Sequence, residues 1–220
     1  MHSSLKLQFP LLLALCGAIA GCASTQPVAY GGLASAAHLR PNADDKSGRV
    51  PFSYTTAVTL RDYSSIIIDP VLVYRGQDSQ FEEVSDDQKD MLAAYMQGEF
   101  ESRLRNRLRI SRDAGWKTLR LKLTLTGAKS STRFLSTVTR FDLVGGPYNI
   151  VQSIRGKEGT FTGSVSYAVE LYDASTNLLV SAYVAKQYPS PMNISASLGP
   201  MDASKAGIWN GADELLAAFN

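Results

Sequence analysis

The chain has 220 residues, which is enough for one domain with a substantial hydrophobic core. Hydrophobic residues make up 45% and charged residues 19%, a balance that excludes a disordered chain. The formal net charge of +2 gives no support to a general nucleic-acid-binding role.

The chain has few cysteine and histidine residues, and all of them lie in its N-terminal part. The two cysteines are Cys16 and Cys22, and the two histidines are His2 and His38. The folded domain predicted below begins after all four, so disulfides, catalytic thiolates and metal sites built on these residues are not expected in it. We expect no catalytic residue, no cofactor and no metal, and we predict that the protein is not an enzyme.

Residues 1–21 have the pattern of a signal peptide. Lys6 supplies a positive charge, and the apolar stretch over 7–20 is shorter than the roughly 20 residues of a spanning helix. The stretch ends in Ile19-Ala20-Gly21-Cys22, which resembles the lipobox of bacterial lipoprotein precursors. We therefore predict cleavage before Cys22 and attachment of diacylglycerol and palmitate-type chains to that residue, which makes a stable anchor. The alternative is an ordinary secretory signal.

The residues after the cysteine suggest where the anchor is held. Ala23 stands where an aspartate would resemble the inner-membrane retention signal, so we expect an outer-membrane lipoprotein that faces the periplasm. Residues 22–57 are rich in Ala, Ser, Gly, Pro and Asn, which predicts a flexible tether with an end-to-end distance of roughly 30 Å. The alternative is a docked linker, with Phe52 and Tyr54 packed on the edge of the domain.

Residues 58–220 are predicted to form a single mixed α/β domain. Its first strand is a β-branched run within 64–74, which is expected to end, or to form an edge or a bulge, at Asp69-Pro70. Ser85 and Gln88 form a capping box, and apolar residues then recur at three- and four-residue spacing, which predicts a helix over 86–108.

The second half of the domain alternates with a period of two. Leucines alternate with polar residues over 119–126, and residues 160–172 and 178–186 are predicted to form a hairpin. An amphipathic helix from about residue 204 closes the core. The sequence thus predicts an α+β fold: a mixed sheet of about four strands in the order β-α-β-β-α, covered by two amphipathic helices, after a signal peptide and a flexible tether. The first two strands are expected to be parallel.

Several short stretches carry a family resemblance. They are Asp62-Tyr63, Ile66-Ile67-Ile68-Asp69-Pro70-Val71, Thr118-Leu119-Arg120-Leu121, residues 163–174 and Trp209. On these residues the chain resembles the domain-of-unknown-function 3313 (DUF3313) lipoproteins of Gram-negative bacteria. The resemblance covers roughly residue 61 to the C-terminus. It implies an envelope location and a mixed α/β fold, and it assigns no activity and no functional residue.

Residues 130–155 make an unusually long connection between two predicted strands. The segment carries several large apolar side chains: Phe134, Leu135, Phe141, Leu143, Tyr148 and Ile150. We interpret it as a candidate partner surface; the alternative is that it folds back on the core.

A further pattern is the basic end of the first predicted helix. Arginine recurs there at residues 103, 105, 107, 109 and 112. This pattern indicates either a solvated helix end or a contact with anionic lipid headgroups or an acidic partner.

The sequence therefore predicts a membrane-anchored accessory or binding subunit of a cell-envelope system. Its expected partners are the membrane, through Cys22, and an envelope protein, with no nucleic acid. The alternative function is a small-molecule or lipid-binding module.

Overall fold

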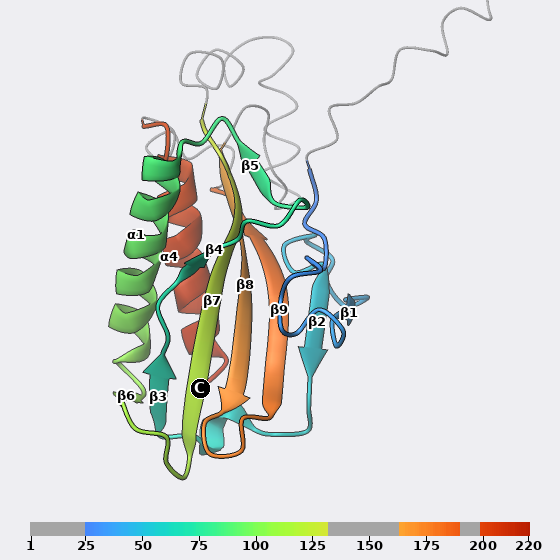
Figure 1. Ribbon diagram of the computed structural model, residues 1–220. Helices are drawn as coiled ribbons and strands as arrows, with labels where there is room; N and C mark the ends of the chain where they lie inside the picture. Colours follow the sequence, from blue (N-terminus) through green and yellow to red (C-terminus); the bar gives the residue numbers. More distant parts are fainter. Residues whose placement is uncertain (1–24, 132–162, 190–198) are drawn as a thin grey trace, which may run out of the picture.

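The computed structural model describes residues 25–131, 163–189 and 199–220 (Figure 1). These residues form one mixed sheet of nine strands, a short 3-10 helix and two α-helices. In chain order the elements are β1 (Arg40–Pro41), β2 (Phe52–Thr55), η1 (Leu60–Asp62), β3 (Ser65–Ile68), β4 (Leu72–Val73), β5 (Gln80–Glu82), α1 (Asp86–Leu104), β6 (Arg109–Ile110), β7 (Thr118–Lys129), β8 (Ser164–Asp173), β9 (Leu179–Gln187) and α4 (Asp202–Ala217).

The antiparallel strands β7, β8 and β9 form the centre of the sheet. Apolar residues stand at every second position along these strands, as the sequence predicts, and these side chains face helices α1 and α4. The leucines of β7 are buried to within 1% exposure, and they pack with the inward-facing residues of β8: Val165, Tyr167, Val169 and Leu171. The alternation over 119–126 and the hairpin are therefore confirmed.

Three short strands pair in parallel with the free edge of β7, one after another along its length. β3 pairs with its first part, β4 with its middle and β5 with its end. Gly127 permits the last pairing, because a Cβ at this position would lie 2.5 Å from the carbonyl oxygen of Gln80. The predicted parallel arrangement of the first two strands is thus present.

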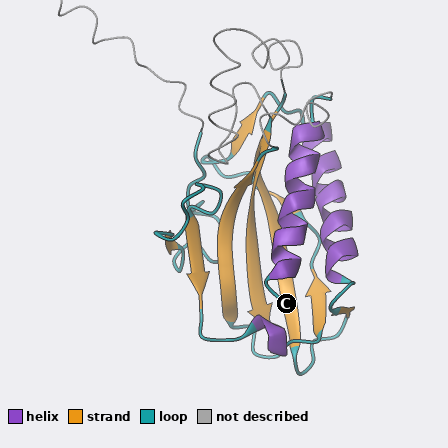
Figure 2. Cartoon of the chain, turned by 180° about the vertical axis from the view of Figure 1, so that it is seen from behind, coloured by secondary structure: helices purple, strands orange, loops and turns teal. Residues whose placement is uncertain are grey.

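Helices α1 and α4 lie side by side on one face of the sheet (Figure 2). The predicted capping box is present, since Ser85 accepts from the Gln88 N–H and the Gln88 side chain accepts from the Ser85 N–H. Arg103 pairs with Asp213 of α4 at 2.7 Å and stacks over the Trp209 ring, so one side chain joins the two helices. Helix α1 ends at Leu104, four residues before the predicted end.

The opposite face of the sheet is covered by the N-terminal segment of the described chain. Tyr30, Leu33 and Leu39 are buried there against side chains of β8 and β9. β2 pairs with β9 over four residues, and β1 pairs with β2.

Two predictions about the fold are therefore wrong, although the class remains α+β. The sheet has nine strands instead of about four, because β1, β2, β4, β5 and β6 are too short to give a periodic pattern. The flexible tether predicted for 22–57 is also wrong for its described part, residues 25–57, which contributes two strands and the buried side chain of Tyr30.

Candidate functional sites at the two ends of the sheet

The site residues predicted from the sequence lie outside the part of the chain that the structure describes. These are Ile19, Ala20, Gly21 and Cys22 of the anchoring motif, and Phe134, Leu135, Phe141, Leu143, Tyr148 and Ile150 of the candidate partner surface. The described residues nevertheless place the ends of both segments. Lys129 pairs with Ser164, so the long connection leaves β7 and returns to β8 at the end of the sheet where Thr25 lies.

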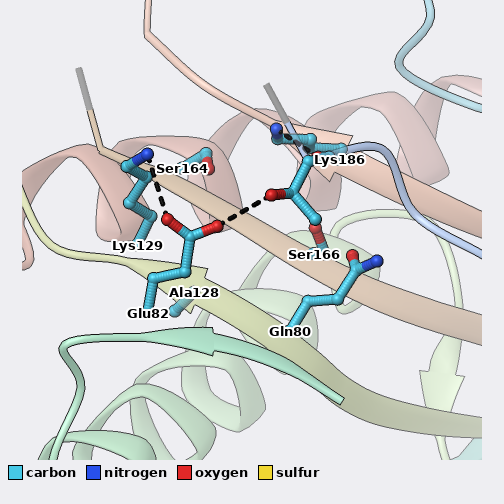
Figure 3. Close-up of a pocket in the computed structure, with 8 residues that line it drawn as sticks. Gln80, Glu82, Ala128, Lys129, Ser164, Ser166 and Lys186 are labelled. Atoms are coloured by element: carbon cyan, nitrogen blue, oxygen red, sulfur yellow. Dashed lines mark hydrogen bonds and ion pairs between the residues drawn. The ribbon is translucent and has the colours of Figure 1, made fainter. Parts of the chain in front are cut away.

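Thr25 is bound to this end of the sheet by its backbone and its side chain. The buried Lys186 of β9 donates from Nζ to the Thr25 carbonyl oxygen at 2.7 Å. The Thr25 hydroxyl donates to the Glu82 carboxylate of β5 at 2.9 Å. We call this arrangement of Thr25, Glu82, Lys129 and Lys186 the clamp; Figure 3 shows how the side chains of the last three converge.

The charged groups of the clamp pair with each other, as in a contact that stabilises the fold. Glu82 pairs with Lys129 of β7 at 3.0 Å, and this contact is the main cause that lowers the pKa of the Glu82 carboxyl. The cavity that these residues line has a volume of about 20 Å³, which has room for about one water molecule. The clamp therefore holds the chain in place and leaves no space for an organic ligand.

The clamp limits the distance between the sheet and the predicted anchor residue. Cys22 lies three residues before Thr25. Since a fully extended chain spans at most about 3.6 Å per residue, three residues reach at most roughly 11 Å. A lipid on Cys22 would thus keep this end of the sheet beside the membrane. A flexible tether, in contrast, would allow a distance of roughly 30 Å between the membrane and the domain.

The opposite end of the sheet exposes apolar side chains on loops. Trp116, just before β7, is 84% exposed, and Leu178, in the turn between β8 and β9, is 67% exposed. Val58, before η1, is 45% exposed. We call the loops over 58–62, 105–117 and 173–178 the tip surface.

The tip surface also carries an excess of positive charge. It contains six basic and three acidic residues. The exposed basic residues are Arg61, Arg105, Arg107, Arg109, Arg112 and Lys117. Of the acids, Asp173 is occupied by hydrogen bonds from Tyr63, Ser175 and Thr176. The basic pattern seen in the sequence therefore continues beyond the helix onto the neighbouring loops.

The backbone beside Trp116 is held in an unfavourable conformation. Lys117 has φ of 57°, in the left-handed region that costs a residue with a Cβ about 1 kcal/mol or more. Its carbonyl oxygen accepts from the N–H groups of Ser64 and Ser65, and its ammonium lies over the Trp116 ring at 4.6 Å. The loop is thus fixed with the indole outward.

Sequence reasoning missed both the clamp and Trp116. Thr25 lies in an Ala- and Ser-rich stretch whose composition hides its contacts. Trp116 is a single large apolar residue among turn residues, and because single apolar residues are common on protein surfaces, its position in the sequence gave no signal. Asp69, which directly follows β3, forms a 4.0 Å ion pair with Arg120 and lines neither the clamp cavity of about 20 Å³ nor the larger groove of about 430 Å³.

No group of three or more His, Cys, Asp or Glu side chains within 25–131, 163–189 and 199–220 is arranged to hold a metal ion. Neither α-helix in these ranges has the length and apolarity needed to cross a membrane.

Comparison with known proteins identifies the family. The family model described as "Protein of unknown function (DUF3313)" matches residues 29–215, which confirms the resemblance drawn from the sequence. Comparison with curated proteins gives no match.

Several solved structures resemble the chain at low identity. A PelC dodecamer from Paraburkholderia phytofirmans is 11% identical, with coverage of 71% of this chain and 91% of that chain and a TM-score of 0.38. A DUF330 protein from Xanthomonas campestris is 12% identical, with coverage of 74% and 90% and a TM-score of 0.37. A DUF4136 protein from Bacteroides thetaiotaomicron is 10% identical, with coverage of 76% and 95% and a TM-score of 0.36.

Proposed function

The chain belongs to the DUF3313 family of proteins of unknown function, and we propose that it is a lipid-anchored, non-enzymatic accessory protein of the bacterial cell envelope. In this proposal Cys22 carries the lipid, the outer membrane holds it, and the domain faces the periplasm. The tip surface binds another envelope protein.

The observation that carries the proposal is the placement of the clamp and the tip surface at opposite ends of β7. Lys129 of the clamp ends this strand, and Trp116 lies two residues before its start. A strand of 12 residues is roughly 40 Å long. An anchor beside the clamp would therefore present the tip surface away from the membrane, where a partner in the periplasm can reach it.

The chemistry of the tip surface favours a protein partner with an acidic surface and an apolar pocket. Tryptophan and arginine are the residues most enriched among those that dominate binding energy in protein interfaces. Trp116 offers an indole in a fixed position, so little conformational entropy is lost when it is buried. The surrounding arginines would accelerate encounter with an acidic partner and make binding sensitive to salt.

The anchoring part of the proposal is tested by the mass of the mature N-terminal peptide and by membrane fractionation. We expect Cys22 to carry a diacylglyceryl group and an amide-linked acyl chain, and the protein to fractionate with the outer membrane. Cys22→Ser removes the acylated residue and the predicted cleavage motif, so the protein should disappear from the outer-membrane fraction and should keep its signal peptide. An exported protein with a free Cys22 thiol would contradict this part.

The partner-binding part is tested by photocrosslinking in intact cells, with a photoreactive residue in place of Trp116 or Leu178. The matched control position is Met91 on α1, which is 40% exposed and lies outside the tip surface. We expect both tip positions to crosslink to the same envelope protein. The yield of the crosslinked product should fall when Arg107 and Arg112 are changed to Glu. Equal crosslinking from residue 91, or no protein adduct at either tip position, would reject the tip surface as the binding site.

A further inference from the structure

A groove lies between the second half of α4 and the edge of the sheet formed by β2 and β9. Its volume is about 430 Å³, which is within the range of small-molecule sites. It is lined by Asn42, Val50, Ser53, Thr55, Leu60, Leu171, Ser181, Ala182, Tyr183, Glu214, Leu215 and Ala218. The groove shares none of these residues with the clamp.

The groove exists because the sheet extends beyond the helices. Helix α4 packs on β8 and β9, while β2 adds one more strand beyond β9. The register pairs Ser53 with Tyr183 and Thr55 with Ser181, so these side chains share the helix-facing side of the sheet. Three of them are small hydroxyl residues, which leave space where a large apolar residue would fill it.

The lining of the groove combines apolar and polar groups. Val50, Leu60 and Leu215 contribute apolar side chains, and β2 and β9 contribute the hydroxyls of Ser53, Thr55 and Ser181. Of the residues that line the groove, Glu214 is the one with a charged side chain. A ligand that fills the groove would therefore be largely apolar, with one polar group near Glu214.

Glu214 is held at the groove by a buried neighbour. The fully buried Gln187 donates from Nε2 to the Glu214 carboxylate at 2.5 Å, and its Oε1 accepts from Arg49 at 3.2 Å. Partial desolvation raises the pKa of the Glu214 carboxyl, while Arg49 and the Gln187 hydrogen bond act in the opposite direction. One carboxylate oxygen is thus fixed by Gln187, and the other has no hydrogen bond from a described residue.

We propose that this groove binds a small, largely apolar amine, with the ammonium group of the ligand on Glu214 and its apolar part between α4 and the β2–β9 edge. The charge of Glu214 complements an ammonium group and repels a carboxylate. A charge-assisted hydrogen bond is roughly twice as strong as a neutral one, so an amine binds more tightly than the matching alcohol. The inference does not rest on the lipid anchor or on partner binding, although Leu60 lines the groove and also belongs to the tip surface.

A matched series of three probes tests the proposal: 3-phenylpropylamine, 3-phenylpropan-1-ol and 3-phenylpropanoate. They are titrated into the full chain carrying Cys22→Ser, with amide chemical shifts as the readout. We expect the amine to bind on the order of tenfold more tightly than the alcohol, the carboxylate to bind least, and the shifts to concentrate at β2, β9 and the end of α4. Shifts elsewhere, or an amine no tighter than the alcohol, would overturn the proposal.

Two variants separate the charge from the cavity. Glu214→Gln should abolish the preference for the amine and preserve binding of the alcohol, whereas Glu101→Gln on α1 should leave the preference intact. Ala218→Trp adds bulk at an exposed residue that lines the groove, and it should abolish binding of both probes without lowering the melting temperature. Retained amine binding in Ala218→Trp would place the site elsewhere.

Discussion

The buried carboxylate of Glu170 accepts a hydrogen bond from the backbone N–H of Ser35 at 2.6 Å, across 135 residues of sequence. Glu170 is 4% exposed and Ser35 is 1% exposed. A buried polar group lowers stability unless it has a hydrogen-bond partner. Any other position of the N-terminal segment would leave Glu170 and the Ser35 N–H without each other, so this contact selects the docked position. The segment is therefore a layer of the domain.

Replacing Glu170 tests this role. Glu170→Ala leaves the Ser35 N–H buried without an acceptor, and we expect a loss of about 2 kcal/mol in the free energy of unfolding, with faster hydrogen exchange over residues 30–40. Glu170→Gln keeps an acceptor and should cost less. The control is Glu101→Ala, which removes an exposed ion pair with Arg105 and should cost at most about 0.5 kcal/mol. Equal losses for the two alanine variants would reject the role of Glu170.

The long elements of this fold were predictable because their signals are local. The leucines of β7 face a core on one side only, and the capping box of α1 lies within four consecutive residues. In each case the residues that determine the element are close together in the sequence, and the prediction was confirmed.

The short strands and the docked segment were not predictable, because contacts far along the chain determine them. β4 has two residues, and it is a strand because β7 lies beside it. Tyr30 is buried because Ala168 and Ala182 leave space for it on the open face of the sheet. The composition around Tyr30 indicates a linker, and nothing nearby in the sequence identifies the surface that it covers. The clamp and the groove were missed for the same reason.

Because α4 packs closely on β8, we predict that Gly211→Ala destabilises the protein, although alanine is usually favoured over glycine within a helix. A Cβ at Gly211 would lie 1.7 Å from the buried Tyr167 hydroxyl, which has no hydrogen-bond partner among the described residues. Overpacking of this kind typically costs 1–3 kcal/mol, so we expect Gly211→Ala to lower the free energy of unfolding by about 2 kcal/mol despite the better helix propensity of alanine. Urea denaturation measures this change.

The control for Gly211 is Gly98 on α1, where a Cβ meets no atom within 4 Å. Gly98→Ala should stabilise the protein by about 0.5–1 kcal/mol. Tyr167→Phe removes the hydroxyl that the new methyl group would meet, so it should recover most of the loss caused by Gly211→Ala. Destabilisation by Gly98→Ala, or no recovery in the double variant, would contradict the steric explanation.

Asp173 predicts how stability depends on pH in acid. Hydrogen bonds from Ser175, Thr176 and Tyr63 lower the pKa of its carboxyl from an ordinary value of 3.8 to about 2. Because the folded-state pKa is depressed, the stabilising contribution is complete above about pH 4 and is lost as the pH falls through about 2. We expect Asp173→Ala to melt at a lower temperature at pH 7 and to lose less further stability between pH 4 and pH 2. Parallel pH profiles for the variant and the parent chain would contradict this expectation.

The proposed orientation at the membrane predicts that lipid-attached quenchers reduce tryptophan fluorescence at one end of the sheet and not at the other. The chain has two tryptophans, so variants with a single tryptophan can measure this difference. With Trp209→Phe, all tryptophan fluorescence comes from Trp116, at the end of the sheet remote from the clamp. If a lipid on Cys22 lies within roughly 11 Å of Thr25, headgroup-attached quenchers in the anchoring vesicle should leave Trp116 emission nearly unchanged, since β7 separates the two ends by roughly 40 Å. In a chain with Trp209→Phe and Trp116→Phe, a single tryptophan placed at Ser130, the partly exposed residue after β7, should be quenched in the same vesicles. Strong quenching of Trp116 would mean that the tip surface faces the anchoring membrane, and the proposed orientation would then be wrong even if Cys22 carries the lipid.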